Sequence, residues 1–349
     1  SGWASSSFIK NLDNDKYDVT VISPDNKFLY TPLLANNIRN NTTLTMDINK
    51  LNKNNKINYI DNYIKRFNFN NNFVLTQDDI PYNYDFLVLS YGSEINTFSI
   101  PGVQKNCKFI KTTNDVDSIR EDLIKLPNNS KIAVIGCGLT GTEVIGNLLD
   151  YNKFKIYAID ALPLPLSTFN NNVRSELALL WLNNNINCIF NHFVEQIDDK
   201  FIYLKNNSIE YDMAIWCGGI KKHLLTDIVN HELKLDCRFG VPVDNYMKVK
   251  NIHNVYAIGD CAYNTNPPTA QVAYQEGQYL AEYFNNNCES PGFKYQDKGQ
   301  ICYIGKNSSI YQYNDSVYFS GIICGYINKL IHLYNSINLE QMFNILWNK

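Results

Sequence analysis

Short apolar runs alternate with helical patterns along this chain, and the alternation predicts an α/β fold. The clearest example is residues 131–160. An apolar run at residues 132–135 predicts a buried strand, helical spacing continues through Leu149, and a second apolar strand ends on Asp160. Two strands joined by a helix form a βαβ unit, so this stretch predicts two parallel strands with a crossover helix.

Three glycines stand in the turn between that first strand and the helix. Gly136, Gly138 and Gly141 have the G-x-G-x-x-G spacing of a dinucleotide-binding fingerprint. The first glycine allows a tight turn, the second lets the backbone approach a pyrophosphate at the helix N-terminus, and the third lets helix and strand pack closely. Asp160 follows about 20 residues later, where a carboxylate can accept hydrogen bonds from ribose hydroxyls. Strand, turn, helix, strand and acid together favour a nucleotide site over a merely structural glycine turn.

The chain opens on a partial copy of the same pattern. Its first residues predict a helix entered from a glycine turn at Gly2, and residues 17–23 predict the next strand. We expect one more glycine and an apolar strand ahead of Ser1 in the full-length protein, which would make Gly2 the second glycine of another fingerprint. The strand at residues 17–23 ends without the usual acid, and either Ser23 or Asp25 takes its place.

Later segments repeat a strand that is followed by glycine. Residues 84–93 end in a turn at Gly92, which suits the close approach of a ligand, and residues 213–219 repeat the pattern with Gly218 and Gly219. Helical patterns are also present at residues 113–126, before the βαβ unit, and at residues 173–183, after it. Because the two halves have matched layouts, they predict two similar dinucleotide-binding domains.

Two patterns near the C-terminus keep more than one interpretation. Gln271 and Gln275 stand four residues apart on one predicted helix face, which fits either a solvated face or a site. From Tyr318 onward the chain is apolar and aromatic, with apolar faces at helical spacing in two pieces. These pieces fit a membrane-interface helix, a dimer contact or a cover over the core. The second piece contains Leu339, Met342, Phe343, Ile345, Leu346 and Trp347.

Composition and charge exclude several classes of protein. A chain of 349 residues with 45% hydrophobic and 19% charged residues is globular and long enough for two domains. Its net charge of -3 gives no reason to expect nucleic acid as a partner. The nine cysteines include no C-x-x-C pair, so neither a disulfide framework nor a metal site is indicated, and a reducing compartment is expected. No apolar run reaches the roughly 20 residues of a membrane-spanning helix.

Together these motifs resemble the type II NADH dehydrogenases, which are single-subunit, non-pumping NADH:quinone oxidoreductases. The resemblance covers essentially the whole chain. It rests on Gly2-Trp3 with the following helix and on residues 28–34, 100–102, 257–260 and 267–275. It implies an α/β fold with two Rossmann-like domains and a C-terminal amphipathic helical membrane-docking segment. The implied domains are 1–104 with 240–290 for FAD, 105–239 for NADH, and 291–349 for membrane association or dimerisation.

The resemblance also implies two cofactors and the residues that hold them. FAD is expected at Gly2, Trp3, Ser23, Thr31, Pro32, Gly92, Gly259, Asp260, Ala270 and Gln271. NADH is expected at Gly136, Gly138, Leu139, Thr140, Gly141, Glu143, Asp160, Gly218 and Gly219. NADH should be preferred to NADPH, because the Asp160 carboxylate repels a 2′-phosphate and no Arg or Lys stands between Ala161 and Val173 to receive one. Cys217 departs mildly from the family, which usually has Ala-Thr-Gly where this chain has Cys-Gly-Gly.

Catalytic roles and partners follow from the same resemblance. Gln271 and Gln275 are expected to border a quinone pocket. Glu143, placed in the first helical turn, is expected to act as a nicotinamide-side or proton-handling carboxylate rather than only as a partner of the helix dipole. Two electrons are expected to pass from NADH through the flavin to a membrane quinone. The protein is expected to be a homodimer held peripherally on the reducing face of a membrane, which in a eukaryote is the mitochondrial inner membrane.

Other classes of flavoprotein fit the chain less well. A soluble reductase that serves a protein electron carrier needs an exposed basic docking face, whereas this chain has an apolar tail. A disulfide reductase is disfavoured because the sequence has neither C-x-x-C nor C-x-x-x-x-C. A sulfide:quinone oxidoreductase needs cysteines at the flavin, and the sequence gives no basis for pairing any two of the nine cysteines. A degenerate flavoprotein retained for binding or assembly is the non-catalytic alternative.

Overall fold

The computed structural model describes residues 2–51 and 57–334. They form two compact units, and each unit is assembled from three separate stretches of chain. The first unit contains the residues up to Tyr30, Thr45–Glu94 and Ile220–Gln296. The second contains Thr31–Leu44, Ile95–Gly219 and the residues from Asp297 onward. The functional assignment of the FAD, NADH and C-terminal ranges stays a prediction.

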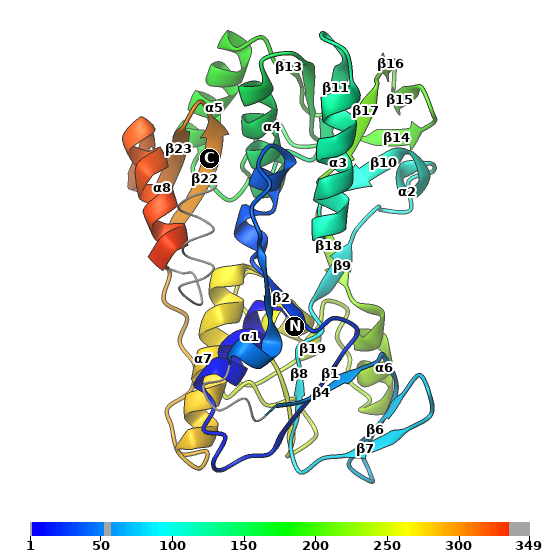
Figure 1. Ribbon diagram of the computed structural model, residues 1–349, viewed down its shortest axis with the longest axis vertical. Helices are drawn as coiled ribbons and strands as arrows, with labels where there is room; N and C mark the ends of the chain where they lie inside the picture. The colour runs from blue at the N-terminus through cyan, green and yellow to red at the C-terminus, as the bar shows by residue number, and fades with distance from the viewer. Residues whose placement is uncertain (1, 52–56, 335–349) are drawn as a thin grey trace. The chain divides into compact units, whose positions relative to one another are not determined.

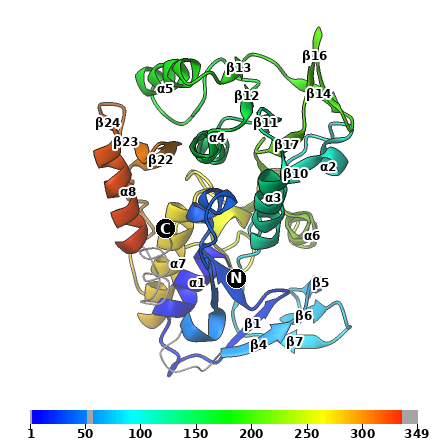
Figure 2. The same ribbon diagram turned by 45° about the horizontal axis from the view of Figure 1, so that its top comes forward.

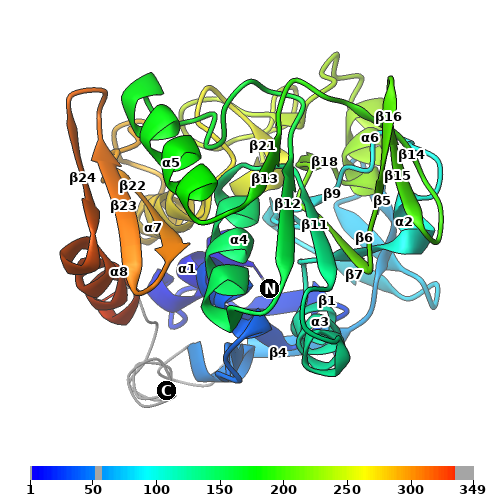
Figure 3. The same ribbon diagram turned by 90° about the horizontal axis from the view of Figure 1, so that it is seen from above.

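A five-stranded parallel sheet forms the centre of the second unit (Figure 3). α4 (Leu139–Tyr151) joins two of its strands, which pair in parallel with Ile132 opposite Ile156, so the predicted βαβ unit is confirmed. Ile132, Ala133 and Val134 have no exposed surface, as expected for a parallel strand covered on both faces. The strand order is β10 (Cys107–Phe109), β17 (Met213–Trp216), β11 (Lys131–Ile135), β12 (Lys155–Ile159) and β13 (Asn187–Ile189).

Capped helices and a small antiparallel sheet surround this sheet. The Thr112 hydroxyl accepts the Asp115 N–H at 3.1 Å and the Asp115 carboxylate accepts the Thr112 N–H at 2.7 Å, so a capping box begins α3 (Thr113–Lys125). The Asn170 side chain caps α5 (Asn171–Asn183) in the same region. Both predicted helices are therefore confirmed. The other elements here are η1 (Thr31–Leu33), η2 (Ala35–Ile38), α2 (Val103–Asn106), β14 (Val194–Ile197), β15 (Phe201–Leu204) and β16 (Asn207–Glu210).

The last described residues form an antiparallel sheet and a helix. β22 (Gln300–Gly305), β23 (Ser308–Tyr313) and β24 (Val317–Gly321) pair in that order, and α8 (Ile322–Tyr334) packs on β23 and β24 (Figure 2). β22 in turn packs on α4. The two backbones approach most closely at a pair of glycines, where a Cβ on Gly146 would lie only 2.7 Å from the Gly305 nitrogen.

The helical interpretation of the apolar tail is wrong for its first residues. Tyr318 and Phe319 lie on β24, where they pair with β23, and the helix begins only at Ile322. Gly321 turns the chain between strand and helix at a φ of 108°, a conformation that glycine adopts readily. The spacing of apolar residues did not predict this strand, because its conformation is decided by pairing with the preceding strand β23 across a short turn. The second apolar piece, residues 339–347, lies outside the described residues.

In the first unit two helices pack closely, α1 (Trp3–Asn11) alongside α7 (Ala270–Asn285) (Figure 1). Glycine permits this approach, because a Cβ on Gly277 of α7 would overlap the carbonyl oxygen of Ala4. The unit also contains two pairs of parallel strands, β1 (Val19–Ser23) with β4 (Ile57–Asp61) and β8 (Leu87–Leu89) with β20 (Val255–Ala257). Both units therefore combine parallel strands with helices, as the predicted α/β fold requires.

The remaining elements of the first unit are short. The single strand predicted at residues 84–93 is in fact β8 followed by β9 (Ser93–Ile95), because Gly92 turns the chain between them at a φ of 71°. The others are β2 (Lys27–Leu29), β3 (Thr45–Asp47), η3 (Ile48–Leu51), β5 (Ile64–Asn68), β6 (Phe73–Thr76), β7 (Pro81–Asn83), β18 (Ile220–Lys222), α6 (Leu224–Glu232), β19 (Val241–Pro242), η4 (Gly259–Cys261) and β21 (Ala262–Tyr263).

Candidate functional site: a nucleotide cradle and a second ligand site

The glycine turn after β11 forms a cradle for a dinucleotide. Gly136 has a φ of 91°, and a Cβ there would lie 2.5 Å from the Cys217 carbonyl oxygen. A Cβ on Gly141 would overlap the carbonyl oxygen of Gly136. Both glycines are therefore required by internal packing. Gly138 is different, because a Cβ there would have no heavy atom within 4 Å. The space above Gly138 is open, which fits a pyrophosphate lying against the backbone.

The same turn leads into the N-terminus of α4, where N–H groups point at that space. Gly138 is the N-cap and contributes no side-chain cap. The N–H groups of Leu139, Thr140 and Gly141 belong to the first turn, where an α-helix has no intrahelical acceptors to offer them. Unpaired N–H groups and the helix dipole favour an anion here. The predicted residues of the fingerprint are thus gathered in one place.

Asp160 is held at the end of β12 by the glycine turn itself. Its Oδ2 accepts the Cys137 N–H at 2.6 Å and its Oδ1 accepts the Leu162 N–H at 2.8 Å. Each carboxylate oxygen has a further lone pair, so the group can still accept hydrogen bonds from two ribose hydroxyls. The sequence pattern predicted the position of Asp160 but not these two backbone contacts, which orient the carboxylate.

The nearest arginine along the chain after Asp160 is engaged by backbone carbonyl groups. Arg174 donates to the carbonyl oxygens of Pro165 and Leu164 at 3.0 and 3.1 Å, and to the Asn171 side chain at 3.0 Å. These bonds fix the loop between β12 and α5. A guanidinium bound in this way serves the loop, so it does not replace the 2′-phosphate-binding arginine of NADPH-specific sites.

Glu143 lies one turn deeper in α4 than the sequence pattern suggested. α4 begins at Leu139 and has no acidic residue in its first turn, so the placement of Glu143 there was wrong. The helix dipole acts mainly within the first turn, and a dipole partner would have a lowered pKa. Burial instead raises the pKa of the Glu143 carboxyl to about 8, although the Tyr303 N–H hydrogen-bonds to it and acts in the opposite direction.

The partner of Glu143 comes from β22, far away in the sequence. Tyr303 also donates its hydroxyl to Asp150 of α4 at 2.6 Å, and the other oxygen of Asp150 accepts the Lys306 N–H at 2.7 Å. Arg39 reaches the same carboxylate at 3.2 Å. The C-terminal end of β22 is therefore bound to α4. The contact between Tyr303 and Glu143 could not be predicted from the sequence, because a main-chain N–H makes it and leaves no sequence signal.

The candidate FAD residues of the first unit surround the start of α1 and the turn after β20. Gly2 caps α1 and has open space where a Cβ would stand. Trp3 packs edge-on against Phe28 and Tyr30, with ring centroids 5.1 Å apart in both cases. Gly92 also has open space around it, and the Ser93 hydroxyl donates to Asp260 at 2.8 Å.

Three of the predicted FAD residues have other surroundings. Ser23 is buried at the end of β1, and its hydroxyl accepts the Asp25 N–H at 3.4 Å, whereas Asp25 itself is exposed. The Asp25 carboxylate instead caps the Lys27 N–H at 2.9 Å. Thr31 and Pro32 lie on η1, which belongs to the second unit.

Gln271 and Gln275 on α7 are hydrogen-bonded to other residues and do not form a simply solvated helix face. The Tyr295 hydroxyl donates to Gln271 Oε1 at 2.9 Å. Gln275 forms two bonds with the backbone of Gln296, donating from Nε2 to the carbonyl at 2.9 Å and accepting the N–H at 3.0 Å. Ala270, the first residue of α7, follows Thr269, whose hydroxyl caps the helix. The pair therefore bounds a polar face shared by α7 and residues 295–296.

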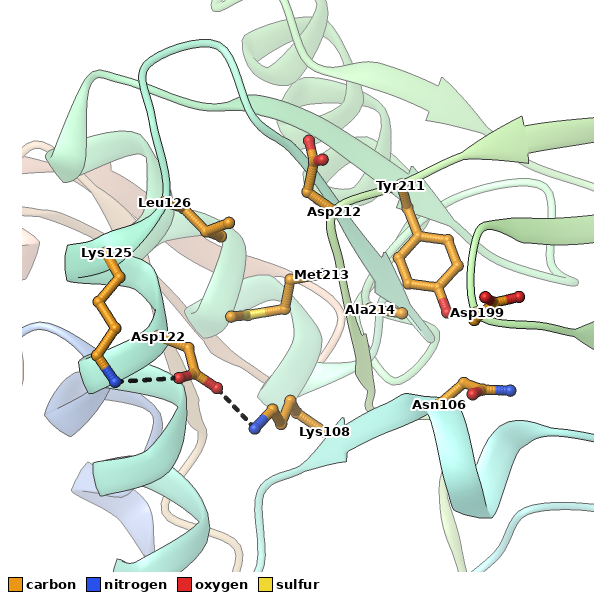
Figure 4. Close-up of a pocket in the computed structure, with 10 residues that line it drawn as sticks. All are labelled: Asn106, Lys108, Asp122, Lys125, Leu126, Asp199, Tyr211, Asp212, Met213 and Ala214. Atoms are coloured by element: carbon orange, nitrogen blue, oxygen red, sulfur yellow. Dashed lines mark ion pairs between the residues drawn. The ribbon is translucent and has the colours of Figure 1, made fainter.

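A charged hollow of about 420 Å³ in the second unit is a separate feature (Figure 4). Asn106 and Met213 line it at the amino ends of β10 and β17, whereas the glycine turns follow the carboxyl ends of the same sheet. Asp122 lies 2.8 Å from Lys108 and 3.6 Å from Lys125, so these three charges compensate one another. Ligands of open α/β sheets bind outside the carboxyl ends, so the hollow is not the nucleotide site.

The cysteines near the glycine turns are not poised for thiol chemistry. Burial raises the pKa of the Cys217 and Cys261 thiols to about 12 and raises that of Cys137 well above its ordinary value. Only the thiolate is a good nucleophile, so these three groups remain protonated and unreactive near neutral pH.

A nucleotide cradle on the parallel sheet of one unit and a further α/β unit in the same chain define a dinucleotide-binding oxidoreductase of the flavoprotein type. A model of the pyridine nucleotide-disulphide oxidoreductase family matches residues 1–277. The chain belongs to that family and, within it, to the type II NADH dehydrogenases. A probable NADH dehydrogenase of Dictyostelium discoideum is 34% identical over 375 residues, covering 92% of this chain and 81% of that protein.

Two further comparisons agree with this placement. The mitochondrial external NADH-ubiquinone oxidoreductase 2 of Saccharomyces cerevisiae is 29% identical over 333 residues, covering 81% of this chain and 60% of that protein. The structure of NDH2 from Plasmodium falciparum in complex with NADH matches with a TM-score of 0.91 at 23% identity, covering 99% of this chain and 95% of that one. At this level of identity the structural match shows a shared fold.

Proposed function

We propose that this protein is an FAD-dependent NADH:quinone oxidoreductase that transfers two electrons from NADH to a membrane quinone without pumping protons. The observation that carries the proposal is the cradle at Gly136, Gly138 and Gly141 with Asp160 bound to it. Kinship with proteins named as NADH-ubiquinone oxidoreductases supplies the substrate class. The residues present fit both cofactors, because open space lies at Gly138 in the second unit and at Gly2 and Gly92 in the first.

The chain's own residues would bind and orient the two cofactors. In the second unit the α4 N-terminus would hold the NADH pyrophosphate and Asp160 the adenosine ribose. After β17, Gly219 would leave room for the nucleotide because a Cβ there has no heavy atom within 4 Å, whereas a Cβ on Gly218 would lie 2.7 Å from the Trp216 ring. In the first unit Gly2 and Asp260 would hold the phosphate and ribityl regions of FAD, with Ser93 fixing the Asp260 carboxylate. Bound FAD supplies the redox chemistry, accepting a hydride and passing two electrons on.

Gln271 and Gln275 would border the quinone. Their bonds to Tyr295 and Gln296 leave each amide in a fixed orientation on one helix face. An amide can donate to a quinone carbonyl, so the pair would orient the acceptor rather than react with it. This role stays a proposal.

The visible spectrum of the full-length protein tests the function. We expect flavin absorption that NADH bleaches under anaerobic conditions and that a short-chain quinone restores. A purified protein without flavin absorption would contradict the proposal. Recovery with a protein electron carrier but not with a quinone would place the protein among the soluble reductases instead.

Glu143→Gln should impair turnover more than folding. General acid–base groups contribute roughly 100- to 10,000-fold to rate, so we expect a loss of at least tenfold in kcat if Glu143 handles a proton near the nicotinamide. Glu121→Gln, which alters an exposed acid on α3, is the matched control and should leave kcat unchanged. Equal kcat in wild type and Glu143→Gln would show that the carboxyl has no part in turnover.

The raised pKa of Glu143 predicts that the stability of the protein depends on pH. The carboxyl has a pKa of about 8 in the fold and an ordinary value of 4.5 otherwise. Between these values the folded state keeps a proton that the unfolded chain releases, so raising the pH favours unfolding. We therefore expect the wild-type Tm to fall relative to that of Glu143→Gln as the pH rises from about 5 to about 8. Parallel Tm profiles for the two proteins would contradict the raised pKa.

We also propose that α8 holds the protein peripherally on a membrane, which the mitochondrial relatives suggest is the mitochondrial inner membrane. α8 buries Cys324, Asn328 and His332 on one side. Ile322, Ile323, Tyr326 and Leu330 are exposed on the other. An amphipathic helix of this kind binds a lipid interface through its apolar face. No helix within residues 2–51 and 57–334 is long and apolar enough to span a membrane.

Ile323→Glu should weaken binding to lipid vesicles at least threefold in a cosedimentation assay, because a charge would replace an apolar group that is 76% exposed. Ile124→Glu is the matched control, since Ile124 is 64% exposed on α3. Unchanged vesicle binding would refute the membrane role of α8. If Ile323→Glu instead converted a homodimer to a monomer in solution, this face would be the dimer contact.

A further inference from the structure

Glu276 is a buried carboxylate that belongs to none of the predicted sites. It lies on α7 directly after Gln275, but on the opposite, inward face of the helix with an exposed fraction of 1%. A buried carboxylate is costly unless hydrogen bonds compensate the loss of water. Burial raises its pKa, and the neighbouring Asp260 carboxylate acts in the same direction. A residue kept at this cost needs an explanation in the contacts that it makes.

Glu276 binds both ends of the loop that follows β20. Its Oε2 accepts the Gly259 N–H at 2.7 Å, and its Oε1 accepts the Asn264 Nδ2 at 2.8 Å. The loop between these two partners contains Asp260. One side chain on α7 therefore closes the loop that carries the acid expected to hold FAD.

The conformation of this loop leaves little freedom. Gly259 has a φ of 74°, and a Cβ there would lie 3.0 Å from the Ala4 Cβ of α1. Asp260 is fixed from the other side, because its Oδ2 accepts the Ser93 hydroxyl at 2.8 Å. Its Oδ1 has no hydrogen-bond partner within the described part of the chain. The carboxylate is thus held by one oxygen with the other available to a ligand.

We propose that Glu276 is a positioning residue for the flavin, which fixes the Gly259–Asp260 turn so that Asp260 presents Oδ1 to a hydroxyl group of FAD. The inference rests on the proposed function only in taking the first unit as the FAD site. Glu276 acts through the backbone of Gly259 and does not itself touch the ligand. A hydroxyl of the ribityl chain or of the ribose has the donor that Oδ1 needs.

FAD affinity of the full-length protein tests the proposal. Glu276→Ala leaves the Gly259 N–H without its acceptor and should raise the Kd for FAD at least tenfold in fluorescence titrations of the deflavinated protein. Glu276→Gln keeps an acceptor for that N–H but turns an amide donor towards Asn264, whose Oδ1 already accepts the Asn266 N–H at 2.9 Å. We therefore expect the glutamine variant to bind FAD more weakly than wild type but at least threefold more tightly than Glu276→Ala, which is partial rescue by the conservative change. Glu282→Ala, an exposed acid on the same helix, is the matched control.

The Kd for NADH separates positioning from general damage. Its predicted site is in the second unit, so a local effect on the turn should leave that constant unchanged. If Glu276→Ala does not fold, Asn264→Ala removes only the second partner and should weaken FAD binding at least threefold. Wild-type FAD affinity in the folded variant, or equal loss in Glu276→Gln and Glu276→Ala, would overturn the proposal. A wild-type protein that binds no FAD would instead refute the proposed function, whereas one that binds FAD but reduces no quinone leaves this inference standing.

Discussion

Gly138→Ala is expected to raise the Kd for NADH at least tenfold while leaving the Tm within about 2 °C of the wild-type value. The added methyl group has no protein atom within 4 Å, so it enters the open space above the turn. A pyrophosphate lying against the backbone would meet that methyl, and a tenfold change in Kd corresponds to about 1.4 kcal/mol. Alanine is a poorer N-cap than glycine, which lowers the stability, but it also reduces the entropy of the unfolded chain, which raises the stability. The two effects oppose each other, so stability should change little.

Gly141→Ala provides the contrast that makes this result interpretable. Its methyl group would overlap the Gly136 carbonyl oxygen, so helix and strand must move apart. We expect this variant to lose several degrees in Tm together with NADH binding, because overpacking typically costs 1–3 kcal/mol. Calorimetric titration with NADH and thermal unfolding of both variants measure the two effects. Unaltered NADH binding by Gly138→Ala would mean that the pyrophosphate lies elsewhere.

Asp160→Ala is expected to reduce the ratio of kcat/KM for NADH to kcat/KM for NADPH at least tenfold. The wild-type carboxylate accepts ribose hydroxyls and repels a 2′-phosphate; at about 4 Å the repulsion of unit charges is on the order of 4 kcal/mol near a protein surface. Removing the carboxylate ends that repulsion. It also frees the N–H groups of Cys137 and Leu162, which can then donate to the phosphate. NADH loses its ribose acceptor at the same time.

The ratio of kcat/KM for the two nucleotides measures this change. Asp199→Ala removes an exposed carboxylate from the same unit and should leave the ratio unaltered, which controls for net charge. We also expect a lower Tm for Asp160→Ala, because the glycine turn loses the acceptor of the Cys137 N–H. An unchanged ratio in a folded variant would remove Asp160 from the nucleotide site.

Local patterns made part of this protein predictable. The β11–α4–β12 unit and its three glycines could be identified because strand, turn and helix signals lie within some 30 residues of each other. The helices α3 and α5 were expected for the same reason, since a helical pattern is carried by residues that are neighbours in the chain. Asp160 was found because its distance from the turn is set by one crossover helix.

The tertiary structure decided what depends on partners far away in the sequence. Glu143 was expected to be a dipole or proton-handling group at the start of a helix, but its pKa is governed by its burial, with an opposing hydrogen bond from Tyr303 of β22. Tyr318 and Phe319 had helical spacing, yet they form a strand, although their partner β23 lies only a short turn before them in the chain. Glu276 gave no sequence signal at all, because it stands out only through its burial and its bonds to Gly259 and Asn264.

The sequence by itself determined the β11–α4–β12 unit with its glycine turn, the helices α3 and α5, and the position of Asp160 at the end of β12. These properties follow from neighbouring residues and from the conformations that glycine alone permits. Only the tertiary structure decided which carboxylates are buried and which N–H group each of them accepts. Burial and hydrogen-bond partners set the pKa and orientation of a carboxylate, and they come from segments that the sequence alone does not bring together.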